Sequence, residues 1–420
     1  MPAGISRREF IALAAAGFAA QGVLGQGRSF DKTYAYVGSW ALGTNGFGTG
    51  GGGGISLFEV GEDGSLSFRS HTGPEFEDLN AGYLTISADG RFLYSTEEVS
   101  DLHDVAGAGG GILSFAINPG DGSLTHLNTQ ASMGVNPAMI VIDSSGKLLL
   151  ASNHAGYEAS TRVVIRNGEP EVERVFDDAT VAVFPINADG TLAPASDVAI
   201  LDRVAGVPGV ASQRGPHAHS VAFDATNERI LVADKGANRL YTYRLNKAEM
   251  KLEDAKHFPV AEGVAPRHSA FHPRASLVFV SNERESSLAS FRFDSNSGDI
   301  QHIQTVASVP QDFDGRNIPS DIKLHPNGNF VYTGNRGHNS ISIHRIDESN
   351  GLMELVDIVP SGGATPRGFT FDPTGNYLMV ANQGSNQVST FAVNAQSGRI
   401  TPTGATADVR RPACIKFLQL

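Results

Sequence analysis

Cysteine is almost missing from this sequence. The only one among its 420 residues is Cys414, which excludes a framework of disulfide bonds within the chain and a zinc site built from cysteines. Basic residues are also few, because 32 lysines and arginines stand against 44 aspartates and glutamates and the formal net charge is −12. Binding to nucleic-acid phosphates needs a basic surface. The composition therefore argues against nucleic acid as the main partner, and an anionic ligand requires a local basic cluster.

Charged residues are scarce as well, at 18% of the chain, whereas 40% of the residues are hydrophobic. This balance excludes a disordered chain, since enough apolar surface is present to offset the entropy of ordering. The 48 glycines have no period of three, so a collagen-like structure is excluded too. Together with 20 prolines they predict many turns. The length fits two or three average domains or one large repetitive domain.

The N-terminus has the layout of a targeting segment. Residues 6–11, SRREFI, form a twin-arginine pattern, and the uncharged stretch Phe10–Val23 that follows is shorter than the roughly 20 residues that span a bilayer. The alternative is a short N-terminal helix or a membrane anchor. We predict that residues 1–27 are a twin-arginine signal peptide, with cleavage between Ala19 and Gly27. Residues 28–420 are then a single domain, exported by the twin-arginine machinery to the periplasm or outside, with no stable membrane insertion after cleavage.

The rest of the chain repeats itself. Four units are spaced by roughly 50 residues, a period typical of propellers and solenoids: Gly215–Asp254, Ala265–Gln304, Ile318–Asp357 and Thr365–Gly404. Each unit contains four short runs rich in β-branched and aromatic residues, separated by Asn, Asp and Gly turns, which predicts four antiparallel strands. Four strands per unit correspond to one blade of a β-propeller.

Weaker copies and the two chain ends complete the count. Gly82–Leu127 and Asn136–Ala195 supply two more blades. The C-terminal segment RPACIKFLQL supplies only a first strand, whereas the N-terminal segments TYAYVGSW, GGISLFEV and GSLSFRS supply the other three. We therefore predict an all-β, seven-bladed propeller, closed by the C-terminal strand joining the N-terminal blade. Closure removes the exposed sheet edges that an open array of blades would leave. The alternative fold, a pair of β-sandwiches, does not explain why each end of the chain carries a matching incomplete unit.

Equivalent positions of the blades form rings around the shared axis, and two rings are candidates for a site. The ring at the ends of the second strands is Trp40, Glu98, His154, Lys235, Glu283, Arg336 and Gln383. The ring at the starts of the first strands contains His219, Arg267, Ser320 and Arg367, with small Gly82, Ala138 and Ala413 in the other blades. Both rings are expected at the same mouth of the channel, because the first strand starts where the second finishes.

Three adjacent blades bring together the catalytic candidates His219, Arg267, Glu283 and Arg336. The substrate-binding candidates around them are Lys235, His268, Asp321, Arg367, His154 and Gln383. Guanidinium groups clamp carboxylate or phosphate and stabilise charge developing on a carbonyl oxygen, so the cluster suits a small anionic or oxyanion-forming substrate. Glu283 is the natural general base for activating water, with His219 as proton donor or second base. Taken singly, each residue is better explained by a solvated loop charge or an interblade ion pair, and only the cluster of cations around one carboxylate favours a site.

The sequence predicts no metal and no cofactor. His217 and His219 share a strand face, but no third ligand follows at a matching spacing. The glycine run within Ala41–Gly54 lacks a following Gly-Lys-Ser/Thr and is not a phosphate loop. That loop and the predicted hairpin around Tyr157–Asp178 are longer than the repeat needs, and we expect them to reshape the mouth. Cys414, in the closing strand, is expected in the core.

The repeats contain the motifs GPHAHS, APRHSAFHP, SNE, VPQDFDG, NRGHNSI and TPRGFTFDPTGNYLMVANQ. These motifs resemble those of the lactonase family of seven-bladed propellers, which includes the propeller-type bacterial 6-phosphogluconolactonases and the fungal carboxymuconate lactonizing enzymes. The resemblance covers essentially the whole mature chain and is most specific from Gly215 to Gln383. It implies a lactone ring opened by water, or the reverse closure. The family's implicated His, Arg, Glu and Arg fall on His219, Arg267, Glu283 and Arg336.

The expected function is a periplasmic lactonase acting on a sugar-acid or related lactone. Arg267 and Arg336 hold the substrate's carboxylate or lactone carbonyl, Glu283 activates water and His219 shuttles a proton. Since an exported protein rarely meets a phosphorylated sugar, lactone hydrolysis is better supported than a phosphogluconolactone substrate. The alternatives are a muconate-type lactonizing cycloisomerase and a noncatalytic propeller that binds a ligand or protein, because a fold alone does not establish activity.

Overall fold

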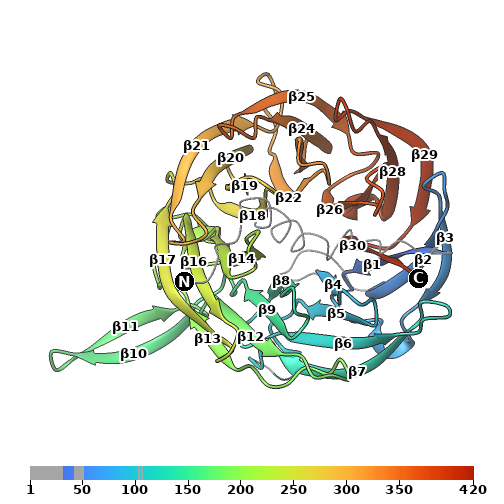
Figure 1. Ribbon diagram of the computed structural model, residues 1–420. Coiled ribbons are helices and arrows are strands. Elements are labelled where there is room, and N and C mark those ends of the chain that lie inside the picture. The colour runs from blue at the N-terminus through green and yellow to red at the C-terminus, as the bar shows by residue number, and fades with distance from the viewer. Residues whose placement is uncertain (1–31, 42–51, 103–104, 106) are drawn as a thin grey trace, which may run out of the picture.

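The computed structural model describes residues 32–41, 52–102, 105 and 107–420, so the predicted signal peptide and most of the glycine-rich loop lie outside the described residues. Seven four-stranded antiparallel sheets surround a common axis (Figure 1). In chain order, the strands are β1 (Thr33–Ser39), β2 (Gly54–Val60), β3 (Leu66–His71), β4 (Leu84–Ile86), β5 (Phe92–Glu97), β6 (Gly111–Ile117), β7 (Leu124–Ala131), β8 (Pro137–Ile142), β9 (Leu148–Asn153), β10 (Ser160–Arg166), β11 (Glu169–Val175), β12 (Thr180–Pro185), β13 (Asp197–Ile200), β14 (Ala218–Phe223), β15 (Arg229–Asp234), β16 (Arg239–Asn246), β17 (Lys251–Pro259), β18 (Pro266–Phe271), β19 (Leu277–Asn282), β20 (Ser287–Phe293), β21 (Ile300–Ala307), β22 (Ile318–Leu324), β23 (Phe330–Arg336), β24 (Ser340–Ile346), β25 (Met353–Pro360), β26 (Pro366–Phe371), β27 (Tyr377–Asn382), β28 (Gln387–Val393), β29 (Ile400–Asp408) and β30 (Pro412–Gln419). Short 3₁₀ helices are η3 (Pro74–Phe76), η5 (Ala211–Gln213) and η6 (Gln383–Ser385).

The two ends of the chain close the ring, as the sequence predicted. The seventh sheet has the order β3-β2-β1-β30, so the C-terminal strand is the innermost strand of a blade whose other strands come from the N-terminal part. Lys32 and Leu420 exchange two backbone hydrogen bonds beside this pair, of 3.3 and 3.0 Å. Cys414 lies in β30 and is buried in an apolar cluster with Tyr36 and Leu57, which confirms its expected place in the core.

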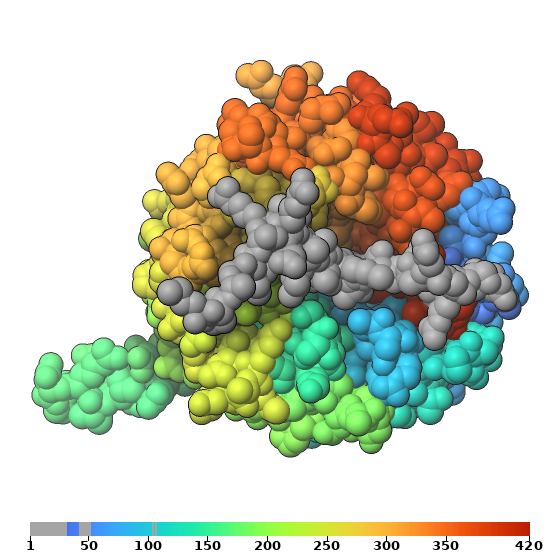
Figure 2. Space-filling view, in the orientation of Figure 1, coloured from blue at the N-terminus to red at the C-terminus, as the bar shows by residue number. Residues whose placement is uncertain are grey.

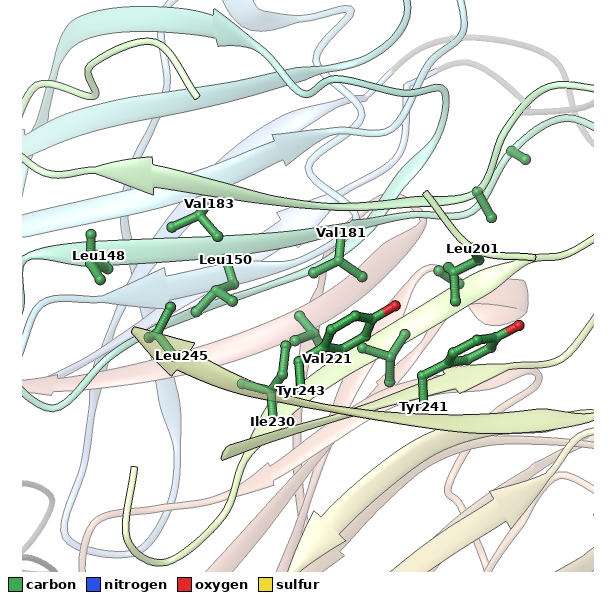
Figure 3. Packing of buried hydrophobic residues seen from close by; sticks show 14 residues of the cluster. Leu148, Leu150, Val181, Val183, Leu201, Val221, Ile230, Tyr241, Tyr243 and Leu245 are labelled. Carbon is green, nitrogen blue, oxygen red and sulfur yellow. The ribbon is translucent and has the colours of Figure 1, made fainter. Parts of the chain in front are cut away.

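Burial decreases from the inner strands of each blade to the outermost one. All residues of β9 and β19 are buried, because both faces of these strands meet neighbouring blades. The outer strand β21 has only exposed and half-buried positions. Figure 3 shows one interblade layer, in which leucines and valines of β9 and β12 pack against Val221, Ile230 and Tyr243 of the next blade. The core is therefore divided into layers between blades.

A two-stranded hairpin, β10–β11, departs from this plan. It forms a separate sheet and stands out from the rim of the disc (Figure 2). Val163, Ile165 and Val172 are 67%, 68% and 72% exposed on it. The sequence predicted that this insertion reshapes the mouth. The strands themselves project outward, and only the base of the insertion, at Tyr157, reaches the candidate site described below.

Deleting β10 and β11 and joining their flanking residues through a short glycine linker is expected to leave the propeller folded. The two strands pair with each other and not with a blade, and a lone hairpin adds little stability of its own. We expect the thermal midpoint to change by less than about 5 °C, on the order of 1–2 kcal/mol for a chain of this size. Calorimetry checks this value. A much larger loss indicates that the hairpin supports the rim.

Candidate active site

Irregular first strands carry the residues at the centre of the ring. In six blades the register between the first and second strands shifts near the start of the first strand, and Pro begins the pairing in four of them. Proline donates no ladder hydrogen bond, and a bulge leaves an unpaired residue whose side chain can be re-aimed. The residues at these shifts are Ala138, His219, Arg267 with His268, Ser320 with Asp321, Arg367 and Ala413. The predicted first-strand ring thus coincides with the bulges.

Glu283, directly after β19, lies among three cations. Its Oε1 accepts a hydrogen bond of 2.9 Å from Lys235 Nζ. Its Oε2 lies 3.0 Å from Arg267 Nε and 3.1 Å from Arg336 Nη2. Arg267 is 1% exposed, and its Nη1 donates a hydrogen bond of 2.6 Å to the carbonyl of Ser320. The structure therefore brings together three of the four catalytic candidates, with Lys235 added.

The electrostatics of this cation cluster, defined as Lys235, Arg267 and Arg336, favour the ionised form of Glu283. Burial by itself raises the pKa of that carboxyl, but the three cations outweigh burial and hold the pKa well below its usual range. Burial and the neighbouring Arg336 lower the pKa of Arg267 to about 9. Cationic charges thus exceed the single carboxylate between them, and the excess is available to an anionic group of a ligand.

A second carboxyl occupies another part of the ring. Trp40 Nε1 donates a hydrogen bond of 3.1 Å to Glu98 Oε2. Arg367 Nη2 lies 3.4 Å from both oxygens of Glu98, and the Arg367 guanidinium stacks 3.8 Å from the centre of the Trp40 ring. Burial raises the pKa of Glu98, although Arg367 and Arg267 act in the opposite direction. A Cβ at position 82 would meet Glu98 Oε2 at 2.1 Å, so the small residue there leaves the room that this carboxyl occupies.

Histidines fill the ring beside the cation cluster. His219 lies with its ring centre 5.2 Å from that of His154 and 5.0 Å from that of His268. His154 Nε2 accepts a hydrogen bond of 3.2 Å from the Tyr157 hydroxyl, and its ring stacks on His217 at 4.5 Å. Burial, and then nearby cations, lower the pKa of His219 and His154 well below the usual value, so both are neutral near pH 7.

His268 and Asp321 form a buried pair from two neighbouring blades. His268 Nδ1 lies 2.9 Å from Asp321 Oδ1, and Lys323 Nζ donates a hydrogen bond of 2.8 Å to the same oxygen. Although burial raises the pKa of Asp321, Lys323 and His268 lower it well below its usual range. Burial and Arg267 lower the pKa of His268 to about 3. Near neutral pH the pair is a carboxylate that accepts a hydrogen bond from a neutral imidazole.

A small cavity lies on the axis. It has a volume of about 10 Å³, room for about one water molecule. Its lining comes from the innermost strand, or the residues just before it, of all seven blades: Gly82, Tyr83, Ala138, His219, Arg267, His268, Asp321, Arg367, Gly368, Ala413 and Cys414. A substrate as large as a sugar lactone does not fit into this volume, so the geometry suits water inside and a substrate at the mouth.

The predicted residues separate into groups. Glu283, Arg267, Arg336 and Lys235 are in direct contact, whereas His219 belongs to the histidines and makes no hydrogen bond to Glu283. Arg367 pairs with Glu98, which the sequence placed in the ring but not among the site residues. Gln383 begins η6, and its buried Nε2 has no hydrogen-bond partner among the described residues.

Comparison of the repeats did not select Tyr157 as a site residue, because it lies in an insertion that has no equivalent in the other repeats. The sequence indicated Trp40 and Glu98 only through their positions in the ring at the ends of the second strands. His217, considered as a metal ligand, instead donates a hydrogen bond from Nδ1 to the carbonyl of His154 at 2.8 Å. In the described part of the chain, no group of three or more His, Cys, Asp or Glu side chains is arranged to hold a metal ion. None of the helices described here has the length and hydrophobicity that a membrane crossing requires.

Comparison with known proteins shows which family has this architecture. A family model described as "Lactonase, 7-bladed beta-propeller" matches residues 35–417. A 6-phosphogluconolactonase of Bacillus subtilis is 28% identical over 340 residues, 81% of this chain and 87% of the relative. One of Formosa agariphila is 29% identical over 296 residues, 69% of this chain and 75% of the relative. The solved structure of a periplasmic gluconolactonase of Pseudomonas aeruginosa is 25% identical with a TM-score of 0.77, covering 92% of this chain and 99% of that one. The chain belongs to the lactonase family of seven-bladed β-propellers.

Proposed function

We propose that this protein hydrolyses a lactone of a sugar acid or a related hydroxy acid. The observation that carries the proposal is the cation cluster around Glu283, at the edge of a cavity that has room for one water. When water attacks a lactone carbonyl, negative charge develops on the carbonyl oxygen. Preorganised cations in a site of low water content stabilise such charge strongly. Arg267 is almost fully buried and contacts the carbonyl of Ser320 and the carboxylate of Glu283. Arg336 donates to the carbonyls of Ile318 and Pro319 and to Glu283, so both guanidinium groups are preorganised.

The roles follow from the contacts. Arg267 and Arg336 receive the lactone carbonyl or a carboxylate of the substrate, and Lys235 adds a third charge. Glu283 was expected to activate water. Cations on both of its oxygens make it a weak base, so its role in this proposal is first to hold the cations in their places. Imidazoles that are neutral near pH 7, among them His219, line the cavity and are the proton acceptors in this proposal.

The substrate class is a lactone without a phosphate group. The relatives named above act, by their names, on phosphogluconolactone and gluconolactone. The twin-arginine pattern of residues 6–11 supports export, and the Pseudomonas aeruginosa relative is named as periplasmic. Phosphorylated sugars are rare outside the cytoplasm, which favours a lactone such as glucono-1,5-lactone met in the periplasm after export by the twin-arginine machinery.

A lactone panel followed in a pH-stat tests the proposal. The wild type is expected to release acid from at least one sugar lactone faster than the uncatalysed reaction. Glu283→Gln, assayed while folded, is expected to lose about 10²-fold or more in kcat/KM, since its cations are no longer held. Glu348→Gln, in an exposed pair with Arg274, is the matched control and should leave the rate unchanged. If no lactone is turned over, the protein is a noncatalytic propeller and the proposal fails.

A further inference from the structure

Two buried imidazole nitrogens at the axial cavity have no hydrogen-bond partner among the described residues. They are His219 Nδ1 and His268 Nε2, and both residues line the cavity. Each histidine is 5% exposed, so bulk water does not satisfy these atoms. Leaving a buried polar atom unpaired is destabilising. A water held by these two nitrogens removes that cost, and the cavity volume of about 10 Å³ is the size that one water needs.

Of the two histidines, His268 is the one that is oriented to act as a base. Its Nδ1–H is held by Asp321 Oδ1 at 2.9 Å, which leaves the lone pair on Nε2. Asp321 is itself fixed, because the backbone N–H of Ile322 and the Lys323 ammonium donate to the same oxygen at 2.9 and 2.8 Å. In the part of the chain that the structure describes, no carboxylate holds His219 in this way, and its Nδ1 is unpaired. A carboxylate that fixes the tautomer of an imidazole and stabilises its cationic form is the arrangement that activates nucleophiles in hydrolases.

We propose that the axial cavity binds the hydrolytic water between His219 and His268, and that His268, oriented by Asp321, is the base that activates this water. The inference rests on the lactonase function proposed above. Arg267 connects the two parts of the site, since it lines the cavity and also belongs to the cation cluster. Water in the cavity therefore lies beside the place where the carbonyl oxygen of the substrate is received.

The reaction balances with these groups alone. The water oxygen forms a bond to the lactone carbonyl carbon while one of its protons moves to His268 Nε2, and the carbonyl electron pair moves to the oxygen beside the cations. The electron pair of the oxyanion then re-forms the C=O bond as the bond from that carbon to the ring oxygen breaks. The electron pair of the broken bond stays on the ring oxygen, and the proton on His268 moves to that oxygen. The product is the open hydroxy acid, which releases a proton to solvent at neutral pH. Asp321 keeps its hydrogen bond throughout and is a positioning residue.

Kinetics of three variants test the role of the pair. His268→Gln and Asp321→Asn are expected to lower kcat by about 10²–10⁴-fold, the usual contribution of a general base, with little change in KM. Asp321→Glu is expected to recover part of the rate because it restores a carboxylate. His302→Gln, on the exposed outer strand of the same blade, is the matched control and keeps the wild-type rate. Wild-type values of kcat in His268→Gln or Asp321→Asn overturn the proposal, even though lactone hydrolysis itself stands.

Two measurements on the wild type keep the proposal testable if a variant does not fold. Nitrogen-15 NMR of the histidines is expected to show His268 protonated on Nδ1 and bare on Nε2. A crystal structure is expected to show a water within hydrogen-bond distance of His219 Nδ1 and His268 Nε2. The Nε2-protonated tautomer, or a cavity without a water peak, overturns the inference. Failure of the lactone panel with the water present removes the proposed function and the catalytic role together, and leaves only the water site.

Discussion

A chain that ends before Pro412 is expected to lose cooperative folding. The missing strand, β30, pairs with β1 and contributes Cys414, Ile415 and Leu418 to two buried clusters. Burying one large apolar side chain contributes about 1.5–3 kcal/mol, and a domain has only about 5–15 kcal/mol of net stability. The loss also exposes β1 as an unpaired edge, which favours association between chains.

Circular dichroism during heating and size-exclusion chromatography measure this outcome. The truncated chain should show no sharp transition and should elute as aggregates. A circular permutant is the matched control: it omits residues 1–31, joins Leu420 to Lys32 through a short turn, and opens the chain at the tip of the β10–β11 hairpin. Because Leu420 and Lys32 already exchange backbone hydrogen bonds, it keeps every blade strand and should fold. A truncated chain that unfolds cooperatively near the wild-type temperature contradicts the role of the closure.

Glu283→Gln is expected to destabilise the protein by about 3–5 kcal/mol, the usual cost of removing one partner from a buried ionic network. The carboxylate is the shared partner of Lys235, Arg267 and Arg336, and its side chain is only 15% exposed. With glutamine in its place, three cations repel one another with no compensating charge. The low pKa of the Glu283 carboxyl has a related consequence. A carboxyl whose pKa is depressed in the folded state stabilises the protein at pH values above its pKa in the unfolded chain, about 4.3. This stability is lost as the pH falls toward the pKa of the carboxyl in the folded state.

Urea denaturation of Glu283→Gln and Arg267→Met at pH 7 separates this explanation from a general intolerance of substitution. Arg267→Met removes one of three cations and relieves its repulsion with Arg336, so it should cost less than Glu283→Gln although Arg267 is the more deeply buried residue. High salt should reduce the cost of Glu283→Gln, because dissolved ions screen the repulsion among the three cations. An equal or larger cost for Arg267→Met contradicts the assignment of Glu283 as the residue that holds the cluster.

The repeats in the sequence were sufficient for the blade count and the closure of the ring. Each blade uses the same local rules, namely alternating strands and Asn, Asp or Gly turns, so internal comparison substitutes for structural information. The matching incomplete units at the two ends predicted the pairing of β30 with β1, and the sheet order confirms it. The ring argument also selected Glu283, Arg267 and Arg336, which are in contact, because equivalent positions in a closed ring must surround one axis.

Tertiary structure alone decided which members of the rings meet. Side chains of different lengths extend from seven blades toward one axis, so their contacts depend on rotamers and on the bulges that re-aim them. The pairing of Glu98 with Arg367 and Trp40, and of His268 with Asp321, joins residues far apart in sequence, and no repeat unit contains both partners. Opposite shifts in the pKa of Glu98 and Glu283 have the same origin. The repeat sets which strand each carboxyl follows, whereas the number of cations around it depends on neighbouring blades.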